Sequence, residues 1–287
     1  MKAWNALKKL LTHPEDSRDR QRIAIALAKG GAMRQARAVN PVDPASWEFS
    51  GFSQNGEDGV LDVLRGRLTA SNRCFVEIGS GDGVENNTAW LLVAEKYAGL
   101  MVEGDPWLAR RTRRNITPLS IGCDCRSLFV TRNSVEQVRA LAPCADPDVF
   151  SLDIDGNDYH IMKAAFDAGF RPRIIVVEYN AVFGPERRLT IEYQSNFMLA
   201  DADPRRLRYG VSIAGWRSLM DSQGYRFVTV ERCGVNAFFV DPAWFAPAFL
   251  DGVRGLAFAE NRYQKWKFGM PAERQFELIA GLPYLEL

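Results

Sequence analysis

Short apolar runs alternate with segments of helical period along most of this chain. The runs predict parallel strands, because strands covered on both faces are hydrophobic without interruption. Strands are expected at 74–78, 99–103, 127–131, 148–153 and 173–178, and helices at 57–68, 86–97, 134–141, 158–168 and 212–223. Strands that alternate with helices in this way predict an α/β fold with a parallel sheet between two helical layers.

The pattern changes near residue 225. Two apolar runs at 225–231 and 236–240 flank Cys233 and Gly234, an arrangement that predicts a β-hairpin. The sheet is therefore expected to be Rossmann-like and mostly parallel, and to close with an antiparallel hairpin strand. The tail beyond about residue 250 is expected to be helical, with Trp266 and Phe268 packing it down.

Composition divides the chain into three parts. Residues 1–46 carry nine Lys or Arg against four Asp or Glu and predict a basic helical extension. The α/β domain is expected at 47–245 and a helical C-terminal extension at 246–287. Near the start, apolar residues recur at helical spacing at Trp4, Leu7, Leu10 and Leu11. They favour either a helix that packs on the domain or on a second copy of the chain, or one that touches an anionic membrane surface.

The most informative polar segment follows the first predicted strand. This strand ends in Glu77 and continues into Gly79, Gly81 and Gly83, an E-x-G-x-G-x-G spacing. Such glycines let a ligand approach the backbone at the carboxyl edge of a parallel sheet. The next strand again ends in an acid, Glu103, whose carboxylate suits ribose hydroxyls. Together the two elements predict a site for an adenosine-containing cofactor.

The glycine spacing distinguishes between two such cofactors. A dinucleotide loop needs a small residue where its helix packs on the strand, and Val84 stands there instead. The preceding acid suits S-adenosylmethionine, because the amino group of this cofactor is a cation. Glu77 and the three glycines are therefore expected at the methionine part, Glu103 at the ribose, and Phe129 and Val130 near the adenine.

A second acidic group follows the fourth and fifth predicted strands. Asp153 and Asp155 follow the fourth strand, and Glu178 and Asn180 follow the fifth. The carboxyl ends of parallel strands share one edge of a sheet, so these oxygens are expected beside the cofactor. Hard divalent cations such as Mg²⁺ take ligands of this kind. The four residues are therefore the predicted metal set.

The same acids are the candidate catalytic groups. Asp153 and Asp155 are expected to activate a substrate hydroxyl, either as a general base or through a metal that lowers the hydroxyl pKa. His160, inside the following helix, is a further candidate base, although packing is the commoner role for a histidine placed there. Asp158 is expected to cap that helix.

Two other function classes compete with a cofactor-dependent transferase. Asp153-x-Asp155 has the form of the metal-binding DxD of nucleotide-sugar glycosyltransferases, a hypothesis that leaves the glycine loop without a role. A domain that binds the cofactor but catalyses nothing is the other alternative.

The composition of the chain argues against several other classes of protein. A chain of 287 residues that is 47% hydrophobic can bury one sizeable core, and a net charge of +1 does not indicate nucleic-acid binding. Five cysteines without a C-x-x-C pair, and two histidines, predict neither a disulfide framework nor a zinc site. With no apolar run of eighteen residues and no signal-peptide core, the sequence predicts a cytoplasmic protein.

Several segments together resemble FkbM-type methyltransferases. They are the acid and glycine loop at 77–83, the strand-ending acid and proline-containing turn at 103–106, and the acidic segment at 153–158. The upstream segment S-Q-N-G-E-D at 53–58 is similar to one found in a branch of that family. The resemblance covers about residues 50–240. The chain departs from the family pattern at Asp155 and Asp158, where each carboxylate is one methylene shorter.

The resemblance implies a class I methyltransferase fold and methyl transfer from S-adenosylmethionine to an oxygen, often a hydroxyl of a sugar or natural product. A small molecule or glycan is therefore the expected acceptor. The stretch between residues 183 and 209 is cationic because it carries Arg187, Arg188, Arg205, Arg206 and Arg208. These arginines favour either an anionic glycan or an ordinary solvated surface.

Overall fold

A seven-stranded sheet runs through the computed structural model, which describes residues 2–287 and the side chains of residues 17–287. Its strand order is β3-β2-β1-β4-β5-β8-β7. The strands are β1 (Cys74–Ile78), β2 (Ala98–Glu103), β3 (Cys123–Ser127), β4 (Val149–Leu152), β5 (Ile174–Glu178), β7 (Arg226–Val230) and β8 (Asn236–Val240). The first five are parallel, whereas β8 is antiparallel to both β5 and β7. The predicted fold, mostly parallel and closed by an antiparallel hairpin, is confirmed.

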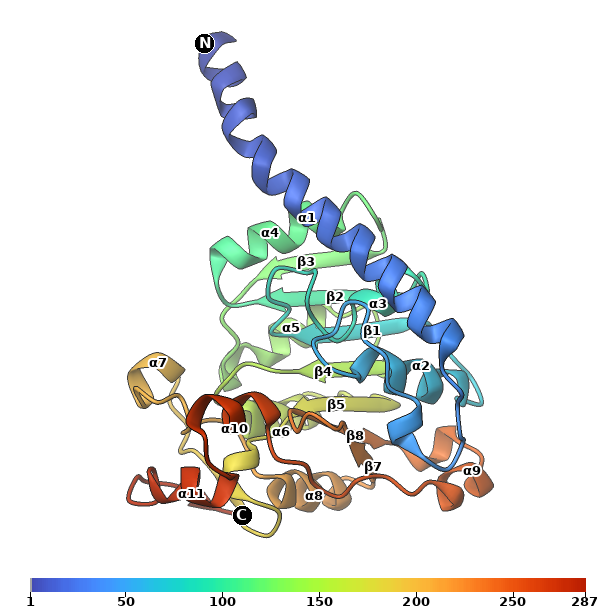
Figure 1. Cartoon of the computed structure of the whole chain (residues 1–287), viewed down its shortest axis with the longest axis vertical. Helices are drawn as coiled ribbons and strands as arrows, with labels where there is room; N and C mark the ends of the chain where they lie inside the picture. The colour runs from blue at the N-terminus through green and yellow to red at the C-terminus, as the bar shows by residue number, and fades with distance from the viewer. Residues whose placement is uncertain (1) are drawn as a thin grey trace.

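Helices cover both faces of the sheet (Figure 1). One face packs against α1 (Lys2–Ala36), α2 (Glu57–Gly66) and α3 (Ala89–Val93). The other packs against α5 (Val135–Leu141), α6 (Asp158–Asp167) and α8 (Ile213–Ser222). Side chains that alternate along each strand supply the two hydrophobic layers, as Phe75 and Val76 do on β1. Both layers are therefore built from the continuous apolar runs that predicted the strands.

The helix α1 lies across one face, and its N-terminal turns extend beyond the edge strand β3 (Figure 1). Its second half belongs to the core: Ile23 is buried, and a Cβ added to Gly30 would lie 2.5 Å from the ring of Trp90. The side chains of Trp4, Leu7, Leu10 and Leu11, on which the membrane hypothesis rests, lie outside the described residues. No described helix combines the length and apolar character needed to cross a membrane.

The C-terminal residues fold back on the domain. They form α9 (Pro247–Gly252), α10 (Arg262–Phe268), α11 (Ala272–Glu277) and a short ladder of β9 (Leu285–Glu286) with β6 (Leu189–Thr190). Phe268 packs on the small cluster around Phe183, as predicted. The prediction for Trp266 is wrong, because this side chain is 79% exposed. Gln264 and Phe268 are one helical turn apart and face inward, which leaves Trp266 on the outer side of α10.

The third strand was predicted four residues too late. The strand β3 occupies the edge of the sheet and pairs with β2 alone, so it needs a single apolar face. Cys125 supplies that face, while Arg126 is exposed, and both Cys123 and Cys125 are free thiols. The apolar residues 128–130 follow the strand and line a cavity instead of joining the sheet.

The sequence did not predict α4 (Pro106–Ile116), a helix that carries four arginines. Its start was nevertheless encoded. Asp105 accepts hydrogen bonds from the backbone N–H groups of Trp107 and Leu108, and Pro106 occupies the first helical position.

The helix α3 is shorter than the predicted 86–97 at both ends. It begins late because Asn86 accepts hydrogen bonds from the amides of Thr88 and Ala89, and it ends at Val93.

Candidate functional site

A cavity of about 700 Å³ opens at the carboxyl edge of the sheet, beside β1, β2 and β4. The glycine loop and Glu103 line one part of it, and Asp153 and Asp155 line another. The apolar side chains of Val102, Leu128, Phe129 and Val130 form a wall between β2 and β3, and α7 (Leu199–Ala202) also contributes to the lining. The cavity therefore brings together part of the set that the sequence predicted for the cofactor and for the reaction.

The three glycines of the loop all have positive φ, at +91° for Gly79, +58° for Gly81 and +76° for Gly83. Gly79 also lies against β4, because a Cβ there would fall 1.7 Å from the carbonyl oxygen of Asp153. Gly79 and Gly81 line the cavity. Gly83 instead packs on α4, 2.9 Å from Thr112 measured to an added Cβ. Two of the three predicted glycines therefore face the cavity.

Glu77 lies beneath the loop and does not line the main cavity. Its two carboxylate oxygens accept hydrogen bonds from the amide of Asn87 at 3.0 Å and from the hydroxyl of Thr88 at 2.6 Å. Burial raises the pKa of Glu77 to about 7, even though these hydrogen bonds oppose the shift. The carboxylate faces a small polar chamber of about 80 Å³ that Gly79 and Asp153 also line. In this structure Glu77 fixes the end of the glycine loop.

Glu103 faces the cavity from the end of β2. One oxygen accepts the amide of Gly81 and the other the amide of Asp105, both at 2.8 Å. Burial raises the pKa of Glu103, and the backbone hydrogen bonds partly offset the shift. Because each carboxylate oxygen has two lone pairs, both can accept a further hydrogen bond from a ligand.

Asp153, Asp155 and Glu178 form the acidic cluster of the site. Ligand oxygens from the three side chains all lie within 4.8 Å of one another. Glu178 is 8% exposed, and its Oε2 has no hydrogen-bond partner among the described residues. Burial, and then the charge of Asp153, raise the pKa of Glu178 well above its usual range. Burial and the charges of Asp155 and Asp158 do the same for Asp153. The repulsion makes a shared proton or a cation favourable here.

Two residues predicted near this cluster have structural roles. Asp158 accepts hydrogen bonds from the amides of Ile154 and Gly156, at 2.9 and 2.8 Å. It therefore binds the loop before α6 instead of the first turn of that helix, and it fixes Asp155 at a φ of +53°. Asn180 is buried, accepts from the amide of Val182, and donates to the carbonyls of Leu207 and Tyr209. The structure does not bring Asn180 into the group of three carboxylates.

His160 is buried away from the cavity lining. Its Nδ1 lies 2.6 Å from Arg132 Nη2, and its Nε2 lies 2.8 Å from the carbonyl oxygen of Ile191. This arrangement fits a neutral ring that donates through Nε2 and accepts at Nδ1, and burial lowers the pKa of His160. With both nitrogens engaged, His160 is placed to pack α6 against the 191–193 segment, where it also contacts the ring of Tyr193.

Two further residues lie at the acidic end, of which the sequence indicated only Arg206, as one member of the arginine-rich stretch. Arg206 lines the cavity with a φ of +58°. Burial raises the pKa of Asp155, and the charge of Arg206 partly opposes that rise. Tyr209 is buried next to Glu178, where it partly opposes the rise in the Glu178 pKa, and it accepts a hydrogen bond from Gln264. The run of arginines was visible in the sequence, but their spacing does not show which one reaches the cavity.

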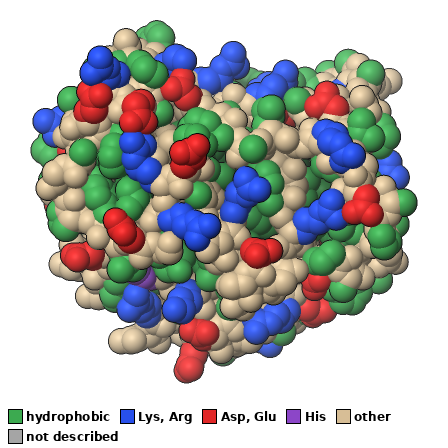
Figure 2. All heavy atoms as spheres, turned by 90° about the horizontal axis from the view of Figure 1, so that it is seen from below, with side chains coloured by type: hydrophobic (Ala, Val, Ile, Leu, Met, Phe, Trp, Pro, Cys, Tyr) green, Lys and Arg blue, Asp and Glu red, His purple; other side chains and the backbone are tan. Residues whose placement is uncertain are grey.

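Two other arginines of that run have partners outside the cavity. Arg187 pairs with Glu273 at 2.6 Å, and Arg208 is buried and donates to the carbonyl of Pro283. Figure 2, which views the molecule from below with α8 and α11 on the near side, shows basic and acidic side chains interspersed over that face. The stretch is therefore not one continuous cationic surface.

Comparisons with known proteins gave fold neighbours only. No protein-family model matches this chain, and no curated protein matches it. An O-methyltransferase from Bacillus cereus in complex with SAH is 16% identical, with a TM-score of 0.43, over 76% of this chain and 89% of its own. The SAH-bound methyltransferase PaMTH1 of Podospora anserina is 12% identical, with a TM-score of 0.44, over 75% and 87%.

A third neighbour is the O-methyltransferase TomG from Streptomyces achromogenes, involved in tomaymycin synthesis and solved with SAM. It is 13% identical to this chain, with a TM-score of 0.42, over 75% of this chain and 87% of its own. TM-scores below 0.5 make these likenesses too weak to decide the cofactor or the reaction of this chain. Both are argued below from the residues of the cavity.

Proposed function

We propose that this chain is an S-adenosylmethionine-dependent methyltransferase that acts on a hydroxyl group. The observation that carries the proposal is the order of the groups along one edge of the sheet, where Glu103, the glycine loop, Asp153 and Asp155 line one cavity. The strand β2 ends in Glu103, β1 ends in the glycine loop, and β4 and β5 end in the acidic cluster. Neighbouring strands are about 4.8 Å apart, so Glu103 and Glu178 are separated by roughly 14 Å, with the glycine loop between them.

The residues on the β2 side fit an adenosine. Both oxygens of Glu103 have capacity for the two ribose hydroxyls, and Val102, Leu128 and Val130 offer an apolar wall for a base. Gly79 and Gly81 line the cavity without side chains, so a ligand can approach the backbone closely there. When bound, S-adenosylmethionine supplies an electrophilic methyl group on a sulfonium.

The acidic cluster supplies the group that removes the acceptor proton. Asp153 lines the cavity, and its raised pKa makes it a stronger base than an ordinary carboxylate once it is ionised. Its carboxylate accepts the hydroxyl proton while the acceptor oxygen forms its bond to carbon and the carbon–sulfur bond breaks. Arg206 lies at the same end and favours an anionic acceptor, which agrees with a small molecule or glycan bearing a negative charge.

A divalent cation also fits this cluster. Asp153, Asp155 and Glu178 offer three oxygen ligands, and the unpartnered Oε2 of Glu178 is a buried polar atom in need of one. We propose that these three carboxylates hold a cation such as Mg²⁺, without Asn180. A bound cation would lower the pKa of a hydroxyl beside it.

Calorimetry of the purified chain with four ligands tests the function. S-adenosylmethionine and its demethylated product are expected to bind, whereas a nucleotide sugar and NAD are not. Binding of the nucleotide sugar alone would support the glycosyltransferase alternative. Absence of binding by both S-adenosylmethionine and its product would overturn the proposal.

Glu103→Ala is expected to weaken the binding of S-adenosylmethionine about 10- to 100-fold, because hydrogen bonds to a charged group contribute about 1.5–3 kcal/mol. Titration calorimetry measures the change. Asp124→Ala is the matched control, since Asp124 is an acid on the neighbouring edge strand that pairs with Arg126 and does not line the cavity. Unchanged affinity in Glu103→Ala would show that the ribose assignment is wrong.

The metal proposal predicts a thermal shift. At a cation concentration 100 times Kd, binding adds about 2.7 kcal/mol to the stability of the folded state. Mg²⁺ or Mn²⁺ is therefore expected to raise the Tm of the wild type, and Glu178→Gln is expected to abolish the shift. Asp201→Asn, which removes an exposed acid outside the cluster, should keep it. An equal shift in all three proteins would mean that the cations act on surface charge.

A further inference from the structure

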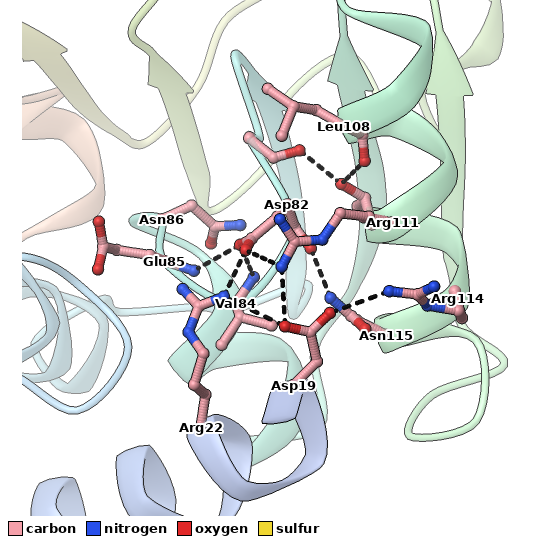
Figure 3. Close-up of polar contacts among 12 residues, drawn as sticks. Asp19, Arg22, Asp82, Val84, Glu85, Asn86, Leu108, Arg111, Arg114 and Asn115 are labelled. Atoms are coloured by element: carbon pink, nitrogen blue, oxygen red, sulfur yellow. Dashed lines mark hydrogen bonds and ion pairs between the residues drawn. The ribbon is translucent and has the colours of Figure 1, made fainter. Parts of the chain in front are cut away.

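The N-terminal helix reaches the glycine loop through a network of partly buried ion pairs (Figure 3). Asp19 of α1 is 3% exposed. Arg111 of α4 places Nη2 2.8 Å from an oxygen of Asp19 and 3.1 Å from an oxygen of Asp82, in the loop. Arg22 of α1 also contacts both acids, at 2.5 Å to Asp82 and 3.4 Å to Asp19, and Arg114 binds Asp19 at 3.1 Å. The helix and the loop are therefore joined by charges of both signs.

The acid at the loop end of this network holds the backbone of the loop. The second carboxylate oxygen of Asp82 accepts hydrogen bonds from the amides of Val84 and Glu85, at 3.0 and 3.3 Å. Its carbonyl oxygen accepts a hydrogen bond from Asn115 of α4 at 2.9 Å. Thr112 of α4 donates to the carbonyl of Gly81 at 2.8 Å. Both sides of Asp82 are thus fixed, and Figure 3 shows these contacts converging on it.

Asp19 is suited to remain charged in this position. Burial alone would raise its pKa, but the hydrogen bond and charge of Arg111, with Arg114 and Asn115, outweigh burial, and the pKa of Asp19 is lowered. Asp19 is a buried carboxylate with several cationic partners. Removing one charged residue from such a network costs folding free energy, because the remaining charges lose a partner of opposite sign. The network therefore favours one relative position of α1, α4 and the loop.

We propose that α1 is a positioning element of the cofactor site: Asp19 and Arg22 hold the glycine loop, through Arg111 and Asp82, in the conformation that presents Gly79 and Gly81 to the cavity. The identity of the cofactor in this inference rests on the proposed function. A loop with three glycines at positive φ has many alternative conformations when it is not held. A ligand that binds one conformation has an apparent affinity reduced by the fraction of loops in that state.

The other end of α1 offers a matched control. There Arg34 binds Asp62 of α2 at 2.9 Å and Glu95 at 2.8 Å, and Arg37 binds the same Asp62. These ion pairs attach the same helix to the same face of the domain. Among the described side chains they make no contact with the glycine loop. Arg34 and Arg22 are also alike in exposure, at 41% and 40% of the side chain.

The experiment compares Asp19→Asn and Arg22→Gln with Arg34→Gln in the full chain. Titration calorimetry measures the Kd for S-adenosylmethionine, and hydrogen exchange without ligand follows the amides of residues 79–85. We expect Asp19→Asn to raise Kd about 5- to 20-fold and Arg22→Gln about threefold, each with faster exchange in the loop. Arg34→Gln is expected to lower the Tm while Kd and loop exchange stay at wild-type values.

The outcomes distinguish a failure of the positioning role of α1 from a failure of the proposed function. Two results would overturn the inference: Arg34→Gln raises Kd as much as Arg22→Gln, or loop exchange is the same in Arg22→Gln and in the wild type. Either result would mean that α1 stabilises the domain without positioning the loop. Should Asp19→Asn fail to fold, Arg22→Gln still decides, because it removes the more exposed partner. If the wild type binds no S-adenosylmethionine, the proposed function fails, and loop exchange alone still tests the inference.

Discussion

Asp153→Asn is expected to lower kcat for methyl transfer by about 10²- to 10⁴-fold, the usual contribution of a positioned general base. The substitution keeps the shape of the side chain and removes only its ability to take the acceptor proton. The Kd for S-adenosylmethionine should stay within about twofold of the wild type, because Glu103 and the glycine loop are untouched. Labelled S-adenosylmethionine with a glycan or metabolite extract, followed by mass spectrometry, measures the transfer.

The pH dependence of the rate tests the same assignment. Without a divalent cation, Asp153 must be ionised to act as the base, so the rate of the cation-free protein is expected to fall as the pH decreases through the raised pKa of Asp153. The charge of Asp155 contributes to that rise, after burial. Asp155→Asn should therefore move the acid limb of the profile to lower pH, whereas Asp201→Asn should leave it in place. A fully active Asp153→Asn with an unchanged profile would assign the base to another group.

The fold was predictable because its signals are local. Each central strand is a mostly apolar run, and three glycines at alternate positions indicate the loop after β1. The edge strand β3 was misplaced for the same reason, since one buried face leaves no continuous run. The helix α4 was not predicted because its four arginines leave only a narrow apolar face, although Asp105 and Pro106 indicate where it begins.

The positions of the site residues were predictable to the level of the sheet edge. Strand ends place Glu103, Asp153 and Glu178 along one edge, which the structure confirms. What each side chain contacts was not predictable. Glu77 and Asn180 have the right residue types, but Glu77 faces Asn87 and Thr88 beneath the loop, and Asn180 binds neighbouring backbone groups. These partners come from loop conformations that no residue spacing specifies.

Contacts between residues distant in the sequence were the least predictable. The residues that join α1 to the glycine loop lie about 60 to 90 positions apart, as with Arg22 and Asp82 or Asp19 and Arg111. Charged residues on a surface helix usually indicate a solvated face, so nothing in the pattern distinguished Asp19 from its neighbours. Only the packing of α1 and α4 against the same loop gives these charges a role.

Gly79→Ala is expected to destabilise the chain by about 2–5 kcal/mol, the sum of a left-handed backbone for a residue with a side chain and a steric clash in a packed region. The clash is with the backbone directly after β4, because the added Cβ would lie 1.7 Å from the carbonyl oxygen of Asp153. Relief requires β1 and β4 to separate at their carboxyl ends. Thermal and denaturant unfolding measure the loss.

Gly81→Ala is the control for that variant. Its φ is +58°, so it shares the backbone strain, but the nearest atom to an added Cβ is the carbonyl oxygen of Glu85 at 3.8 Å. We expect a loss of about 1–2 kcal/mol from strain alone. A loss in Gly79→Ala no greater than in Gly81→Ala would mean that β1 and β4 separate easily. In that case Asp153 is not held rigidly against the glycine loop, and the alignment of acid and methyl donor that the proposed reaction needs must come from the ligands.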